Sequence, residues 1–145
     1  MCLVIKPKQK ALVVKKDIKC FKIVSKTKKE RLLCSFHPQG TLITPYREEV
    51  VVPGLTVTSK IEVNRRQCNT NIADIDVAIH SFTNKIVADK DCEWINDHWG
   101  DKFIAKVFEC IIPKGAKYYI GQFDGYIAGG YASDTLIYPE TIEIP

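Results

Sequence analysis

The sequence lacks any long hydrophobic run, and this absence argues against a protein that spans a membrane with helices. No apolar stretch in its 145 residues approaches the ~20 residues that a helix needs to cross a bilayer. The first ten residues contain lysines but no apolar segment and no small-residue cleavage site, so a signal peptide is not expected. We therefore predict a cytoplasmic protein that does not associate with a membrane.

Motifs of the common enzyme and cofactor families are also missing. The chain has no GxSxG, no Walker A loop and no GxGxxG sequence. Its three histidines, His37, His80 and His98, fit no metal-ligand spacing. The sequence thus predicts no metal, no cofactor and no catalytic residue, and it favours binding over turnover.

No two cysteines have the CxxC spacing of a zinc or redox site. Several of the six lie inside apolar runs, where a reduced thiol packs like a small hydrophobic side chain. Scattered thiols of this kind are typical of a reducing compartment, and three disulfides in an exported protein are the alternative. The cysteines are Cys2, Cys20, Cys34, Cys68, Cys92 and Cys110.

What the chain does contain is ordinary for a globular protein. Apolar residues make up 46% and charged residues 26%, with no repeat and no linker, which predicts a single domain over residues 1–145. The net charge of +4 favours an anionic partner. The basic stretch Lys26 to Arg31 is either a solvated loop or a phosphate-contacting arm, and because no aromatic residue interrupts it, we do not expect nucleic-acid binding.

The stretch from Ala105 to Tyr138 carries the clearest strand pattern. Val107 to Ile112 is an apolar, branched run, which predicts a strand buried on both faces. Pro113-Lys114-Gly115 has the composition of a turn that ends it. Further strands are expected at Lys117 to Ile120 and Tyr131 to Tyr138.

Glycines mark two more features of this stretch. Asp124-Gly125 is a hairpin-type dipeptide, and Gly129-Gly130 indicates a flexible point or a close approach of the backbone to another group. The tyrosines here either cover half-buried sheet faces or line a ligand slot. The tyrosines that could line such a slot are Tyr118, Tyr119 and Tyr131.

The segment before this stretch allows two interpretations. Ile72, Ile75 and Ile79 recur at helical spacing, but residues 75, 77 and 79 also alternate with polar residues as in a strand. We prefer a strand, followed by a helix from about Asn84 to Ile95 that Thr83 caps. The fold class is then α+β, a single strand-rich domain with a mostly antiparallel sheet and one main helix after Thr83.

This interpretation places His80 and Ser81 at a strand end, next to a helix N-terminus. Such a terminus presents unpaired N–H groups and a partial positive charge, which suit a phosphate or a carboxylate. Lys114 or Arg47 would add positive charge. The alternative is that His80 packs near the surface and makes only local hydrogen bonds.

Three sequence motifs carry a family resemblance. They are AIHSF at residues 78–82, CIIPKGAKYYIG at residues 110–121 and YASDTLIY at residues 131–138. These motifs resemble those of small uncharacterised proteins of Bacteroidota and of their tailed phages. The resemblance covers about the C-terminal half of the chain and implies no particular activity.

A second, weaker resemblance is to the ADP-ribosyltransferase-like fold. Arg47, the segment from His80 to Phe82, the helix after Thr83 and the turn at residues 112–115 follow the order of that fold. Where the family has a strand with a catalytic glutamate, this chain has Ala132-Ser133-Asp134. The resemblance therefore implies nucleotide binding without turnover.

We predict a small cytosolic binding protein for an anionic, nucleotide-like ligand. A specific form of this prediction is a phage protein that captures a host immune signal in the host cytoplasm. One alternative is an ADP-ribosyltransferase-like or NAD-hydrolysing enzyme that uses Asp134 or Glu140. Another is a protein–protein module that inhibits a host protein. The predicted ligand-binding residues are Arg47, His80, Ser81, Lys114, Tyr118, Tyr119, Tyr131, Ser133 and Asp134.

Overall fold

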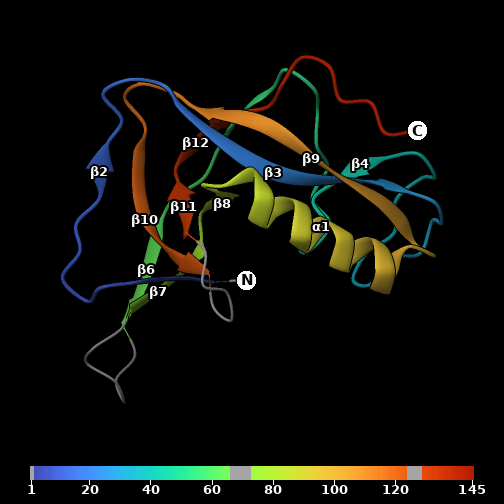
Figure 1. Cartoon of the computed structure of the whole chain (residues 1–145), viewed down its shortest axis with the longest axis horizontal. Coiled ribbons are helices and arrows are strands. Elements are labelled where there is room, and N and C mark those ends of the chain that lie inside the picture. Colours follow the sequence, from blue (N-terminus) through green and yellow to red (C-terminus); the bar gives the residue numbers. More distant parts are fainter. Residues whose placement is uncertain (1, 66–72, 124–128) are drawn as a thin grey trace.

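The computed structural model describes residues 2–65, 73–123 and 129–145, which form twelve strands and one helix (Figure 1). The predicted α+β class, strand-rich with one main helix after Thr83, is confirmed. The elements are β1 (Leu3–Ile5), β2 (Leu12–Val13), β3 (Ile18–Thr27), β4 (Leu42–Ile43), β5 (Thr56–Thr58), β6 (Glu62–Arg65), β7 (Ala73–Val77), β8 (Ile79–Phe82), α1 (Lys85–Trp99), β9 (Phe103–Ile112), β10 (Lys117–Phe123), β11 (Gly129–Ser133) and β12 (Thr135–Ile137).

The described strands form one sheet in which every recorded pairing is antiparallel. Its order is β5-β12-β9-β3-β8-β11-β10-β1-β7-β6, with β2 beside β10 and β4 beside β3. Only Asp134 separates β11 from β12, although three strands lie between them in the sheet order. The sheet must therefore curl back on itself, so that β12, β9, β3, β8 and β11 surround a shared interior.

The single helix covers one part of the sheet, against β9, β3 and β8 (Figure 1). Its N-cap is Asn84, whose side-chain oxygen accepts a hydrogen bond from the Ile86 N–H at 2.8 Å. The prediction that Thr83 caps the helix is wrong. Its hydroxyl instead donates to the Gly129 carbonyl at 3.1 Å and connects the end of β8 to β11. The segment before the helix is two strands, which confirms the strand interpretation over the helical one.

Two cores lie on opposite faces of the sheet. Phe21 and Ile23 of β3 belong to the core beneath α1, whereas Cys20 and Val24 belong to the core inside the curl. This alternation is the two-residue period of a strand. Each face of β3 thus packs on its own apolar cluster.

The expectation that Val107 to Ile112 is buried on both faces is wrong. Phe103 and Ala105 are buried beneath α1, but Glu109 and Ile111, on the same face of β9, are exposed. The helix covers only the first half of this ten-residue strand. An apolar run in the sequence reports the chemistry of its side chains, but not how far a neighbouring helix extends over them.

The predicted last strand, Tyr131 to Tyr138, is broken at one residue. The Asp134 N–H donates to the Lys117 carbonyl at 3.0 Å, and its carbonyl accepts from the Ser59 N–H at 2.9 Å. Asp134 is therefore the corner at which the chain leaves β10 and joins β5 and β9. The expected Asp124-Gly125 hairpin and the Cys68 thiol lie outside the described residues.

No helix within the described ranges is long and apolar enough to span a membrane.

The close approach predicted at Gly129-Gly130 is present at Gly130. A Cβ atom added there would lie 2.3 Å from the ring of Phe123, whereas one added at Gly129 would meet the Thr83 hydroxyl at 3.0 Å. The Phe123 ring is buried and also packs on Phe82, with ring centroids 4.9 Å apart. Gly130 is therefore the position at which this part of the core has no room for a side chain.

We expect Gly130→Ala to lower the free energy of unfolding by about 1–3 kcal/mol, because the added methyl group overpacks a filled core. Urea denaturation followed by circular dichroism would measure it. Gly129→Ala is the matched control and should cost less, since its Cβ would meet the Thr83 hydroxyl at 3.0 Å and not a buried ring at 2.3 Å. Equal stability of Gly130→Ala and the wild type would show that the Phe123 ring moves aside freely.

Candidate functional site

A cleft opens where β3 loses its neighbour on one side. On one edge, β3 pairs with β9 along all ten residues. On the other edge, β8 pairs with it at Phe21, and β4 pairs with it at Ser25 and Lys26. Among the described residues no strand pairs with the intervening Lys22, Ile23 and Val24 on that edge, and the cleft lies beside them.

The cleft encloses about 280 Å³. Its walls come from β3, from the loop between β4 and β5, from β5 and from β8. Such a combination of apolar walls and a few polar groups is typical of small-ligand sites. The polar side chains that line it include those of Lys22, Tyr46, Arg47, Glu49, Ser81 and Tyr138.

Lys22 crosses the gap between β3 and β8. Its ammonium donates to the His80 carbonyl at 2.7 Å. Burial lowers the pKa of Lys22, and the nearby Arg47 charge acts in the same direction, while Glu49 opposes it. Within the described ranges Lys22 forms no ion pair.

Ser81 lies opposite Lys22 on the β8 side of the cleft. Its residue is only 2% exposed, and its hydroxyl has no oxygen or nitrogen partner. A hydrogen bond from this hydroxyl to the Cys20 sulfur opposes the rise in the pKa of Cys20, which burial brings to about 11. A buried hydroxyl without an oxygen or nitrogen partner is rare in folded proteins and indicates a place where an added group could bind.

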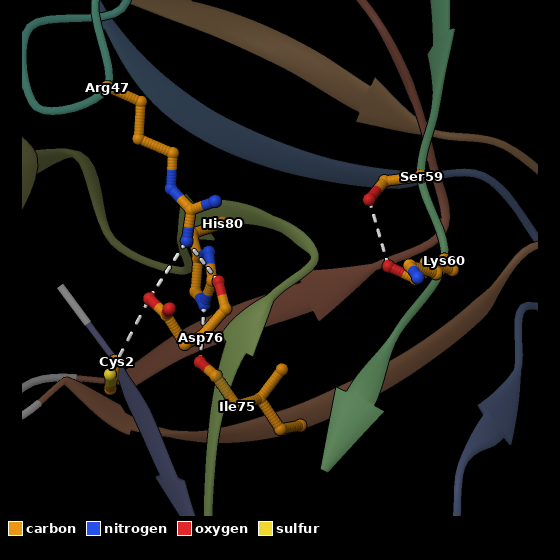
Figure 2. A network of polar contacts seen from close by, with 7 residues as sticks. All are labelled: Cys2, Arg47, Ser59, Lys60, Ile75, Asp76 and His80. Carbon is orange, nitrogen blue, oxygen red and sulfur yellow. Dashed lines mark hydrogen bonds and ion pairs between the residues drawn. The ribbon is translucent and has the colours of Figure 1, made fainter. Parts of the chain in front are cut away.

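Arg47 reaches into the cleft from the loop between β4 and β5 (Figure 2). Its guanidinium donates to both the backbone carbonyl and the side-chain Oδ1 of Asp76, the latter at 2.9 Å. Both side chains are partly exposed, at 39% and 53%, so the ion pair is accessible to solvent and weak. Only one terminal nitrogen of Arg47 makes these contacts, which leaves further N–H donors for another acceptor.

His80 is fixed by a local hydrogen bond. Its Nε2 lies 2.8 Å from the Ile75 carbonyl and therefore carries the proton. Figure 2 draws this hydrogen bond as a dashed line. Burial lowers the pKa of His80 to about 4, helped by the charges of Lys22 and Arg47. The imidazole is thus neutral at pH 7 and adds no positive charge to the cleft.

A buried carboxylate holds the loop that closes the cleft. Glu48, 3% exposed and with a φ of +55°, accepts hydrogen bonds from the N–H groups of Cys34 and Ser35 and from the Ser35 hydroxyl. The flanking residue Tyr46 donates to the Asp91 carboxylate of α1 at 2.9 Å. Anchors on either side of Arg47 therefore fix its position over the cleft.

Of the predicted ligand-binding residues, Arg47, His80 and Ser81 line this cleft together. The structure places the other six outside its lining. Tyr118 and Tyr131 pack edge to face, 5.8 Å apart, against the core inside the curl, while Tyr119 packs on the opposite face. The helix N-terminus is also outside the lining, so the expected phosphate position beside it is not part of the cleft.

The remaining predicted residues make structural contacts. The Lys114 N–H donates to the Asp17 carboxylate at 2.8 Å, and the Ser133 hydroxyl lies 3.5 Å from the Ile79 carbonyl. The Asp134 carboxylate accepts from the Lys117 N–H at 3.0 Å and from the Thr135 hydroxyl at 2.9 Å. The side chain proposed for NAD chemistry is thus a turn anchor at the corner between β11 and β12.

Sequence reasoning missed Lys22, Glu49 and Tyr138. The one available signal was the position of Lys22 between the apolar residues Phe21 and Ile23 in a strand with alternating burial. Alternation predicts that residues 20, 22 and 24 share a face, and residues 20 and 24 are buried. A lysine on a buried face is unusual enough to be considered as a functional residue.

No cluster of three or more histidine, cysteine or acidic side chains that could hold a metal occurs within residues 2–65, 73–123 and 129–145. The described cysteines are free thiols. Burial raises the pKa of Cys110 to about 12 and of Cys20 to about 11, so neither thiol is ionised at neutral pH.

We expect Glu48→Gln to lower the free energy of unfolding by about 2–3 kcal/mol, because the buried N–H donors lose a charged acceptor. Glu143→Gln, at an exposed position, is the matched control and should change stability by less than about 0.5 kcal/mol. Thermal and urea denaturation would measure both. Equal stability of the two variants would contradict the role given to Glu48.

Because His80 is buried in its neutral form, we expect the free energy of unfolding to fall in acid. Its folded-state pKa of about 4 lies below the ordinary 6.5, so the unfolded chain binds the proton first. The destabilisation is absent above pH 6.5, grows as the pH falls, and is complete below pH 4 at about 3 kcal/mol. His80→Gln should flatten the stability profile over this window, whereas His98→Gln should not. Identical profiles for His80→Gln and the wild type would contradict this assignment.

Comparison with protein-family models, with curated proteins and with solved structures finds no match to this chain. The cleft and its chemistry are therefore the basis on which a function is assigned below.

Proposed function

We propose that this chain is a binding protein for a small anionic ligand, held in the cleft between β3 and β8. The observation that carries the proposal is the Lys22 ammonium, which is half-buried in the cleft and forms no ion pair among the described residues. Desolvation lowers its pKa, the charge of Arg47 acts in the same direction, and the charge of Glu49 opposes it. An anion bound beside the ammonium would offset the cost of that desolvation.

The donors of the cleft suit one anionic group. The Lys22 ammonium has three N–H bonds, of which the His80 carbonyl accepts one. The Ser81 hydroxyl has no oxygen or nitrogen partner, and the guanidinium of Arg47 has donors beyond those that contact Asp76. Hydrogen bonds in which the donor or acceptor is charged are roughly twice as strong as neutral ones.

The volume of the cleft limits the size of the ligand. Pockets for drug-sized ligands enclose ~300–1,000 Å³, and this cleft encloses about 280 Å³. A small carboxylate or a phosphate group fits inside it. In the finer proposal of a nucleotide-like ligand, the phosphate occupies the cleft and the base lies at its mouth, where the Tyr46 ring is partly exposed.

The finest version of the proposal, capture of a host immune nucleotide by a phage protein, is supported by the resemblance to small phage proteins. The protein–protein module is the alternative outcome of the test below. Single exposed apolar side chains, such as Phe36 at 73% and Ile86 at 65%, would take part in such contacts. The cleft, however, gives the anion proposal the more specific chemistry.

Isothermal titration calorimetry with phosphate, pyruvate and AMP as separate probes tests the proposal. At least one probe should bind saturably, and Ser81→Ala and Lys22→Met should each weaken it about 10–100-fold, the value of one lost charged hydrogen bond. Lys114→Met and Tyr118→Phe, outside the cleft, should bind like the wild type.

Two results would overturn this assignment. If none of the probes binds, the chain is not a small-anion binder of this kind and the protein–protein module becomes the preferred function. If Lys114→Met weakens binding as much as Lys22→Met does, the ligand lies in the slot near Tyr118 instead. Circular dichroism of each variant would establish that it is folded.

A further inference from the structure

Lys22 differs from the other cleft donors, because its nitrogen can also react. A lysine becomes a nucleophile when burial or a neighbouring cation disfavours its charged form. Lys22 meets the first condition, since its side chain is half-buried between β3 and β8 and desolvation is the largest cause of its lowered pKa. Its ammonium contacts the neutral His80 carbonyl at 2.7 Å. It also faces a cavity large enough for a small molecule, about 280 Å³.

We infer that Lys22 condenses reversibly with the carbonyl group of a small oxo acid, such as pyruvate, that the cleft binds through its carboxylate. This inference rests on the proposed function and names the class of ligand. Arg47 would bind the carboxylate, the Lys22 nitrogen would meet the carbonyl carbon, and the Ser81 hydroxyl would donate to the carbonyl oxygen. Each residue lines the same cleft.

The reaction balances without a cofactor. After the Lys22 ammonium releases a proton, the lone pair of the amine forms a C–N bond to the carbonyl carbon. The nitrogen gives up a second proton and the carbonyl oxygen takes one up, which gives a carbinolamine. The nitrogen then releases its proton while the hydroxyl leaves as water, so that amine and ketone give imine and water. Glu49 and the un-ionised phenol of Tyr138 line the cleft and can pass the proton.

The geometry of the cleft explains why the amine is available. The His80 carbonyl, 2.7 Å from Nζ, is a neutral acceptor that orients the amine without requiring it to be charged. Burial is the largest cause of the lowered pKa of Lys22; the positive charge of Arg47 adds to it, and the negative charge of Glu49 opposes it. The exposed lysine Lys19 on the same strand has neither feature and serves as the matched control.

The test is reductive trapping. The folded wild-type protein is incubated with pyruvate and cyanoborohydride at pH 7, which delivers hydride to the imine carbon and leaves a stable secondary amine. Intact mass followed by peptide mapping locates the adduct. We expect stoichiometric modification of Lys22 in the wild type and in Lys19→Arg, and none at position 22 in Lys22→Arg, which keeps the positive charge.

Peptide mapping of the wild type decides the result even if Lys22→Arg does not fold. Modification spread over exposed lysines at equal rates, with no preference for Lys22, overturns the inference. Saturable binding of pyruvate or phosphate in calorimetry without an adduct at Lys22 also overturns it, while the proposed anion-binding function stands. Absence of both binding and adduct overturns the two together.

Discussion

The structure depends on how β3 divides its two edges between neighbours. One edge is occupied along its whole length by β9, and this long antiparallel pair supports both cores. The other edge is shared, with β8 at Phe21 and β4 from Ser25 onward. Because β8 pairs with β11, and β11 turns at Asp134 into β12 beside β9, the sheet curls around the gap between these two pairings. The cleft is a consequence of that closure.

The polar groups around the gap follow from the same constraint. A sheet edge without a partner strand needs other donors and acceptors, and Lys22 provides one by reaching the His80 carbonyl of β8. The loop between β4 and β5 covers the opening, and Glu48 anchors it through the backbone of Cys34 and Ser35. This arrangement places Arg47 and Lys22 in the lining of one cleft, and an anion bound there would offset the desolvation of the Lys22 ammonium.

Much of the fold was predictable because it depends on local chemistry. Alternation predicted one strand over residues 74–81, which the structure divides at residue 78 into β7 and β8. The turn at Pro113 to Gly115 forms as predicted, with Gly115 at a φ of +90°. The errors arose where another segment decided the outcome. Thr83 loses the cap to Asn84 because its hydroxyl binds Gly129, and β9 is exposed at Glu109 because α1 covers only its first half.

The sequence by itself determined the α+β class and the single helix after Thr83, whereas the choice of residue 130 as the glycine of close approach depends on the Phe123 ring. It also placed Arg47, His80 and Ser81 among the residues of interest, but it could not show that they share a cleft with Lys22. That depends on a contact between residues 58 positions apart, which is set by the register of β3 against β8. The tertiary structure therefore decided the site, because only the curl of the sheet brings an unpaired strand edge, a half-buried lysine and a covering loop together.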